Sequence, residues 1–311
     1  MKLLVVGPGA MGTLFSGLLS LGGHEVWLLG RRPEVVRTIA RDGVTIVRGE
    51  VQRRVAVNAT LAARDAGVVE MVLVFVKAYD TMQACRDALP AIGPDTVVLT
   101  LQNGLNNVEA IASVVGGERV LAGVTAHGAT LLGPGVVRHG GEGESSLGEL
   151  DGRETARLGR VVGAFHQAGI EVSISRIVNS LIWGKLVVNA AINPVTALLR
   201  VPNGQLLDRP ETRSLMAAAA AEVAAVAKAR GVALPYDDPV ASVEMVCRRT
   251  AANRSSMLQD VERGIQTEID YINGAVAREG EALGVPTPVN RTLAQLVRSL
   301  SPVAGPHSPT R

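Results

Sequence analysis

The first 175 residues alternate short apolar runs with amphipathic stretches, a pattern typical of a parallel sheet covered by helices. A continuous apolar run that ends in glycine or polar residues predicts a strand buried on both faces. The predicted strands are residues 2–6, 25–29, 71–76, 96–101 and 120–125. The predicted helices between them are residues 10–21, 33–42, 81–89 and 107–115.

Shorter segments complete this half. Residues 44–47 and 51–57 have the pattern of a hairpin or of two short strands. Residues 136–139 and 145–147 are expected to add to a sheet edge. A helix over 155–168 and a strand over 171–174 close the half.

After about residue 176 the strand pattern disappears. The predicted helices are residues 177–199, 211–230, 239–251, 267–283 and 290–300. We therefore predict an α/β domain over residues 1–175 and an all-α substrate and catalytic domain over residues 176–311. A ligand cleft is expected at the interface between such halves.

The segment Gly7-Pro8-Gly9-Ala10-Met11-Gly12 lies between the first predicted strand and the first predicted helix. This is the context that a dinucleotide-binding turn requires, because the helix then presents free N–H groups to a pyrophosphate. We expect these six residues to bind a dinucleotide and the first domain to be Rossmann-like. The alternative is a tight glycine turn without a ligand.

The residues after the second strand indicate which dinucleotide binds. An NAD site usually carries Asp or Glu there, whereas this chain has Gly30-Arg31-Arg32. Guanidinium groups suit a 2′-phosphate, so we expect NADP, bound by Arg31 or Arg32. The alternative is a solvated arginine pair. Lys77 and Asn103 follow two further strands, at the edge where ligands of α/β sheets bind.

Lys185, Asn189 and Asn193 recur at steps of four in the apolar helix pattern and so share one drifting face. Among 31 lysine and arginine residues, only Lys2, Lys77, Lys185 and Lys228 are lysine. A lysine kept in apolar surroundings suggests proton transfer, which guanidinium cannot perform. The alternative is a lysine that extends to solvent.

Ser256, Asp260, Gly264 and Glu268 also recur at steps of four and are expected on one drifting helix face. Taken alone, this segment is best explained by a serine helix cap, Ser255 or Ser256, and by solvated carboxylates on a helix. The segment Pro202-Asn203-Gly204 has the composition of an ordinary turn.

Five segments together resemble the ketopantoate reductase (2-dehydropantoate 2-reductase) family. They are GPGAMG, VKAYD, LQNG, GKLVVNAAINPVTALLRVPNG and SSMLQDVERGIQTEIDYING, and the resemblance extends from residue 1 to about 300. It implies reduction of ketopantoate to pantoate with NADPH, in pantothenate and coenzyme A biosynthesis. The stretch Thr125–Gly128 resembles another cofactor-side strand end more loosely.

The resemblance also implies roles for single residues. Lys185 matches the proton-donating lysine, and Glu268 matches a residue close to both the ribose and that lysine. The implied substrate contacts are Asn103, Asn189, Asn193, Asn203 and Ser256. The implied cofactor contacts are residues 7–12, Arg31, Lys77, Asn103 and Glu268. Arg32 could replace Arg31 at the 2′-phosphate.

The amino-acid composition limits the kinds of molecule that we expect the chain to bind. The net charge is +2 and only 3% of the 311 residues are aromatic, so we expect neither nucleic acid nor membrane as a partner. Neither the cysteines nor the histidines have metal-ligand spacing, so we expect no metal. We expect a cytoplasmic enzyme, a monomer or homodimer, that acts on a small keto acid. The alternatives are a related reductase of another 2-keto or 3-hydroxy acid and a non-catalytic NADP sensor.

Overall fold

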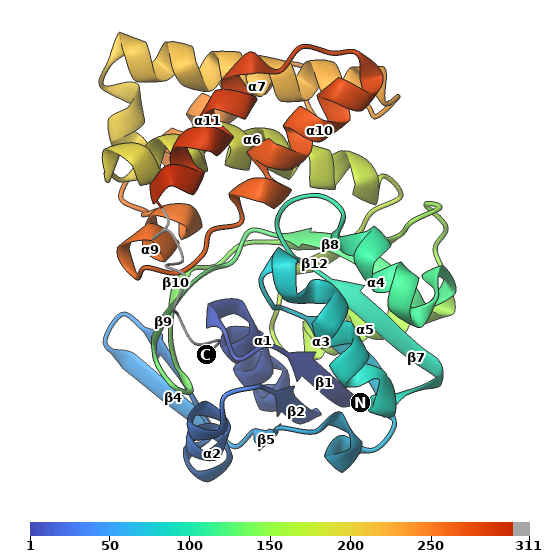
Figure 1. Cartoon of the computed structure of the whole chain (residues 1–311). Helices are drawn as coiled ribbons and strands as arrows, with labels where there is room; N and C mark the ends of the chain where they lie inside the picture. Colours follow the sequence, from blue (N-terminus) through green and yellow to red (C-terminus); the bar gives the residue numbers. More distant parts are fainter. Residues whose placement is uncertain (301–311) are drawn as a thin grey trace, which may run out of the picture. The chain divides into compact units, whose positions relative to one another are not determined.

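The computed structural model describes residues 1–300, which form two compact units (Figure 1). The α/β unit contains Met1–Gln102 and Asn106–Val178. The helical unit contains the residues from Asn179 onward and the short segment Asn103–Leu105. Asn103 therefore belongs to the helical unit, although it follows a strand of the α/β unit.

An eight-stranded sheet, with the order β12-β11-β8-β7-β6-β1-β2-β5, forms the centre of the α/β unit. Its strands are β1 (Lys2–Val6), β2 (Glu25–Leu29), β5 (Asn58–Thr60), β6 (Val69–Val74), β7 (Ile92–Thr100), β8 (Val120–Thr125), β11 (Ser145–Glu149) and β12 (Val172–Ile174). Neighbouring strands run parallel except β8 and β11, which are antiparallel. The prediction of a mainly parallel sheet is confirmed.

A second sheet of four strands has the order β4-β3-β10-β9. Its strands are β3 (Val44–Arg48), β4 (Val51–Val55), β9 (Gly128–Gly133) and β10 (Val136–Gly141). The predicted hairpin is present as β3 and β4. The expectation that residues 136–139 lie at a sheet edge is wrong, because β10 pairs with both β3 and β9 inside this second sheet and buries Val137 in a core shared with the first helix.

Helices cover both faces of the main sheet. They are α1 (Ala10–Leu21), α2 (Pro33–Asp42), α3 (Thr81–Ala88), α4 (Asn107–Val115) and α5 (Ala156–Gln167). Leu3 and Val5 of β1 pack into a core with residues of α1 and α5, whereas Leu4 and Val6 pack into a core with residues of α3 and α4. Successive strand residues point to opposite faces, which explains the continuous apolar run of β1.

The helical unit packs its helices around α6 (Val178–Leu199). The others are α7 (Pro210–Ala229), α8 (Pro239–Arg249), α9 (Ser256–Glu262), α10 (Asn273–Leu283) and α11 (Pro288–Leu300). By length and composition α6 could cross a membrane, but 67% of its apolar window is buried within the protein. Such burial is that of a central core helix, which accounts for its apolar sequence.

The helical pattern of residues 256–283 does not form one continuous helix. It is broken between α9 and α10, and the helix predicted over residues 267–283 begins only at Asn273. The helix α9 ends at Glu262, and Gly264 has a left-handed backbone with φ +64°. The amide of Ile265 donates to Asp260 O and that of Gly264 to Val261 O, which is a Schellman end. A short 3₁₀ turn, η6 (Ile269–Tyr271), then precedes α10. Ser256 and Glu268 therefore do not share a helix face, and that expectation is wrong.

Candidate active site

Segments predicted to bind cofactor follow five strands that are neighbours in the sheet, in the order β8-β7-β6-β1-β2. The segments are residues 7–12 after β1, Arg31 and Arg32 after β2, Lys77 after β6, Asn103 after β7, and Ala126 and His127 after β8. Because these strands are parallel, the segments emerge at the same edge of the sheet, where α/β proteins bind ligands.

The glycine turn is shaped for a group that approaches the backbone closely. Gly7 has φ +106°, and a Cβ on Gly12 would lie 1.9 Å from the carbonyl oxygen of Gly7. A Cβ on Gly9, by contrast, would have no atom closer than Phe75 O, at 4.0 Å. The first amides of α1 precede any acceptor within that helix. This open, N–H-rich turn fits a dinucleotide pyrophosphate.

Arg31 and Arg32 differ in their surroundings. The Arg31 guanidinium forms ion pairs of 3.1 Å with both Asp80 and Asp87. Arg32 is exposed and has no ion-pair partner among residues 1–300. The sequence did not indicate that Asp80 and Asp87 pair with Arg31, because they lie just before and on α3, about fifty residues along the chain from Arg31.

Gln102 connects the ends of β6 and β7 to the start of α3. Its Nε2 donates to Val76 O at 2.7 Å and to Thr81 Oγ1 at 2.9 Å. Its Oε1 accepts from Thr100 Oγ1 at 2.9 Å. Gln102 thereby fixes the backbone immediately before Lys77 and Asn103. The sequence contained a signal for this role, because Gln102 is a polar residue at the end of a buried strand and directly precedes Asn103.

A pair of histidines connects the two sheets. The rings of His127 and His139 join through Nδ1 and Nε2 at 2.9 Å, and Arg48 Nε donates to His139 Nδ1 at 3.0 Å. Burial is the largest influence that lowers the pKa of His127, to about 4. The pair is therefore neutral near pH 7, and its tautomers are set by the arginine, which can only donate.

The helix α6 carries Lys185, Asn189 and Asn193, as the sequence pattern predicted. Burial lowers the pKa of Lys185 from its ordinary 10.5 to about 8, while Glu268 raises it by a smaller amount. Burial therefore outweighs the carboxylate, a balance that the sequence left open. An ammonium with this pKa releases its proton readily near neutral pH.

Two of the predicted substrate contacts in the helical unit each have one side-chain amide atom that is buried without a hydrogen bond within the described chain. The Nδ2 atom of Asn189 and the Oδ1 atom of Asn203 are buried without a hydrogen bond among residues 1–300. The Nδ2 atom of Asn203 donates to Thr250 Oγ1 at 2.9 Å, which orients the amide. A buried unpaired polar atom costs roughly 1–3 kcal/mol. A ligand with both acceptor and donor groups would remove this cost.

The remaining predicted substrate contacts have distinct environments. Asn193 is buried, whereas Ser256 at the start of α9 is exposed. Its neighbour Ser255 has a structural role, because its Oγ caps α9 through Leu258 N and accepts from Thr196 Oγ1. Of the two serines, only Ser256 thus presents its side chain to solvent.

Asn103 lies beside the segment that carries Glu268. The amide of Leu105 donates to Tyr271 O at 2.9 Å, and the amide of Tyr271 donates to Glu268 O at 2.9 Å. Glu268 is itself buried, with 8% of its surface exposed. The helical unit therefore gathers Asn103, Glu268 and, through its charge, Lys185.

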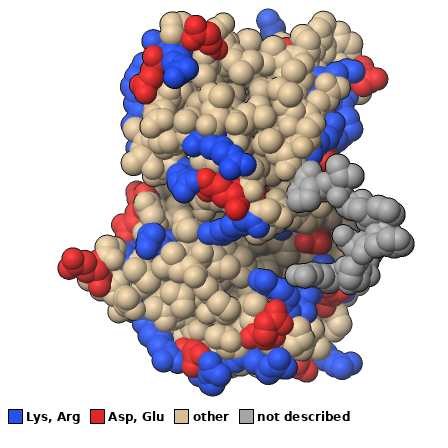
Figure 2. Space-filling view, turned by 60° about the vertical axis from the view of Figure 1, so that its left-hand side comes forward, with Lys and Arg blue, Asp and Glu red and all other residues tan. Residues whose placement is uncertain are grey.

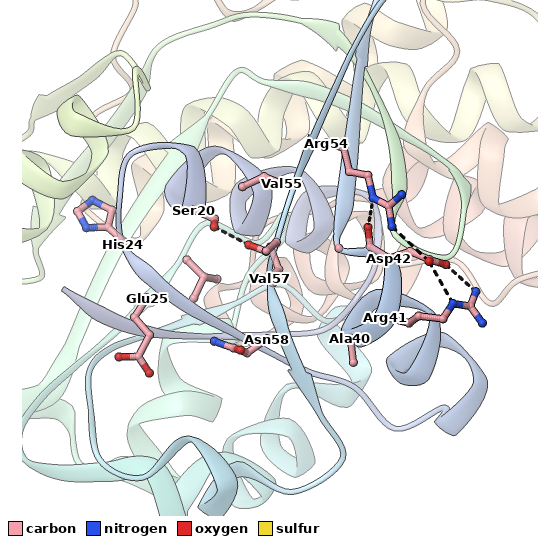
Figure 3. A pocket seen from close by; sticks show the side chains of 13 residues that line it. Ser20, His24, Glu25, Ala40, Arg41, Asp42, Arg54, Val55, Val57 and Asn58 are labelled. Carbon is pink, nitrogen blue, oxygen red and sulfur yellow. Dashed lines mark hydrogen bonds and ion pairs between the residues drawn. The ribbon is translucent and has the colours of Figure 1, made fainter.

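A cavity of about 480 Å³ lies elsewhere in the α/β unit (Figure 3). Its lining includes Glu25 at the amino end of β2, the edge opposite to the predicted ligand edge. Figure 3 shows Arg41 and Arg54 both directed at Asp42, with which they form ion pairs. None of the predicted site residues lines this cavity.

Comparison with known proteins gives matches over nearly the whole chain. Residues 3–152 match the family described as "Ketopantoate reductase PanE/ApbA", and residues 178–301 match "Ketopantoate reductase PanE/ApbA C terminal". The 2-dehydropantoate 2-reductase of Halobacterium salinarum is 39% identical over 96% of this chain and 98% of its own.

Solved structures agree with this fold. A PanE/ApbA family ketopantoate reductase from Ralstonia eutropha is 34% identical, with a TM-score of 0.89 over 96% of this chain and 98% of its own. The ternary structure of D-mandelate dehydrogenase with NADH and anilino(oxo)acetate is 29% identical, with a TM-score of 0.91 over the same shares. The likeness thus includes dehydrogenases of more than one substrate.

Proposed function

Since the chain belongs to the ketopantoate reductase family and is an oxidoreductase with a nicotinamide cofactor, we propose that it reduces 2-dehydropantoate to pantoate with NADPH. The observation that carries the proposal is Lys185, an amine with a pKa of about 8 on the same helix as Asn189, whose Nδ2 atom is buried without a hydrogen bond among residues 1–300. Such a lysine suits a general acid that protonates a reduced ketone.

We assign the cofactor to the edge of the main sheet. The proposed contacts are Gly7, Pro8, Gly9, Ala10, Met11, Gly12, Arg31, Lys77, Asn103 and Glu268. The open turn at Gly9 and the exposed arginines support binding of phosphate groups. When bound, the nicotinamide supplies the hydride to the keto carbon.

We assign the substrate to Asn103, Asn189, Asn193, Asn203 and Ser256. The buried N–H of Asn189 would donate to a carboxylate or carbonyl oxygen, and the buried Oδ1 of Asn203 would accept from a hydroxyl group. Lys185 stabilises the developing oxyanion and donates its proton to it. We propose that residues 1–175 mainly bind NADP and that residues 176–311 mainly bind the substrate.

The likeness to D-mandelate dehydrogenase supports one alternative, a reductase of another small 2-keto or 3-hydroxy acid. A non-catalytic NADP sensor is a weaker alternative, because a sensor has no use for a lysine with a lowered pKa. Basic and acidic side chains are interspersed on the face drawn in Figure 2, which supports a small-molecule substrate rather than a nucleic acid. We retain a cytoplasmic monomer or homodimer as part of the proposal.

Initial rates with a panel of keto acids test this function, with NADPH and NADH measured in parallel. We expect the highest kcat/KM for 2-dehydropantoate with NADPH. A higher kcat/KM for another keto acid would favour the related reductase. Tight binding of NADPH without its oxidation by any keto acid would favour the sensor.

A further inference from the structure

Two carboxylates at opposite ends of α3 hold the guanidinium of Arg31. Its Nη1 lies 3.1 Å from Asp80 Oδ1, and its Nε lies 3.1 Å from Asp87 Oδ2. The three side chains are exposed by 47%, 42% and 36%, respectively. The helix α3 thus brings two negative charges to the arginine that the proposed function assigns to a 2′-phosphate.

Further hydrogen bonds fix both aspartates. The Oδ1 atom of Asp87 accepts from Gln83 Nε2 at 2.8 Å, one helical turn earlier. The backbone amide of Asp80 donates to Lys77 O at 2.8 Å, in the turn that leads into α3. The Asp87 carboxylate is therefore held by a second side chain, and the backbone of Asp80 is held by the turn that leads into α3, so the Arg31 guanidinium lies between two acceptors.

The charges in this cluster do not balance. Among these three side chains, one guanidinium faces two carboxylates, a net charge of −1; Arg32 is the next residue in the sequence and Lys77 begins the turn before Asp80. A 2′-phosphate carries a charge of about −1.5 to −2 and must compete with both carboxylates for Arg31. A 2′-hydroxyl group, by contrast, can donate to a carboxylate, which is its usual partner in NAD sites.

We propose that Asp80 and Asp87 are specificity-determining residues that weaken the preference of this enzyme for NADPH over NADH. They do so by occupying Arg31 and repelling the 2′-phosphate, while Arg32 remains available to bind it. The inference rests on the proposed nicotinamide site and deepens it, because it names what sets the cofactor choice.

The test compares binding of 2′,5′-ADP and 5′-AMP by calorimetry at low ionic strength, where surface charges are least screened. Asp87→Asn and Asp80→Asn each remove a charge and keep an oxygen for Arg31. We expect each variant to bind 2′,5′-ADP roughly three- to tenfold more tightly, with 5′-AMP unchanged or weaker. The NADPH to NADH ratio of kcat/KM should rise by a similar factor.

Asp95→Asn is the matched control, because Asp95 is exposed near the amino end of β7 and its loss changes the net charge equally. It should leave both affinities unchanged. Unchanged or weaker binding of 2′,5′-ADP by both cluster variants would overturn the inference and make the aspartates positioning residues for Arg31. Binding of these probes needs no keto acid, so the result is separate from the identity of the substrate.

Discussion

The α/β unit forms its candidate site mainly from backbone, whereas the helical unit forms its part from side chains. The turn at Gly7 and Gly12 works because side chains are missing there, and its ligand groups are amides. The helix α6 instead carries Lys185, whose pKa is lowered by burial, and Asn189, whose Nδ2 atom is buried without a hydrogen bond among residues 1–300. A site made of backbone groups is lost when the local shape of the chain changes. A site made of side chains can lose one functional group while the protein keeps its fold.

Replacing Lys185 by alanine should have the largest effect on activity. We expect kcat to fall by roughly 10²- to 10⁴-fold, because the proton donor is lost. The melting temperature should stay the same or rise, since a desolvated amine is removed. Stopped-flow or steady-state rates and thermal unfolding measure the two effects. Lys228→Ala, at an exposed lysine of α7, should change neither; near-normal turnover of Lys185→Ala would remove the lysine from the mechanism.

Replacing Gly12 by alanine should affect the backbone site and its fold together. The new Cβ would lie 1.9 Å from the carbonyl oxygen of Gly7, so the turn must shift. We expect nucleotide affinity to fall by more than about tenfold and thermal stability to fall with it. The contrasting variant is Gly163→Ala in α5, where a Cβ would meet nothing within 4 Å.

Gly163→Ala should raise the free energy of unfolding by about 0.4–1 kcal/mol, because alanine restricts the unfolded chain. Equal nucleotide affinity in Gly12→Ala and Gly163→Ala would contradict the assignment of the glycine turn. Calorimetric titration with NADP and chemical denaturation supply the measurements.

Replacing Asn189 by leucine should separate function from stability in the helical unit. The Nδ2 atom of Asn189 is a buried donor without a partner in residues 1–300, so its loss should leave the melting temperature unchanged or higher. The KM for the keto acid should rise by roughly five- to hundredfold, as one buried hydrogen bond to the ligand is lost. A lower melting temperature with an unchanged KM would assign the asparagine to the fold instead.

The smallest expected effect concerns pH. Since Lys185 has a pKa of about 8 and must be protonated to donate, the rate should decline as the pH rises through 8. Glu268→Gln removes the charge that raises this pKa, so the decline should begin at lower pH. Asp270→Asn, at an exposed neighbour paired with Arg298, should leave the profile in place. An unshifted profile in Glu268→Gln would show that this carboxylate does not act on Lys185.

The free energy of unfolding should also depend on the protonation of Lys185, and it should rise with pH. The folded pKa of Lys185 lies below the ordinary 10.5, so the charged lysine disfavours folding. This destabilisation is complete below about pH 8 and disappears as the pH rises from 8 toward 10.5. The free energy of unfolding should therefore gain more over this range in the wild type than in Lys185→Met.

Most strands and helices could be predicted because their signals are local. Residues 3–6 of β1 are all apolar because both faces of the strand are buried. The helix α6 is long enough for its polar residues to recur visibly at steps of four. The pairing of β10 with β3 could not be predicted, since it joins residues about ninety positions apart in the chain. The end of α9 was missed because the left-handed backbone of Gly264 competes with an otherwise helical pattern.

The sequence by itself determined the glycine turn, the polar face of α6 and each of the family motifs, because each is formed by residues close together in the chain. Only the tertiary structure decided that Arg31 meets Asp80 and Asp87, that Gln102 joins two strand ends, and that burial outweighs Glu268 at Lys185. These outcomes depend on distances and on exclusion of water, which arise only when distant segments pack together.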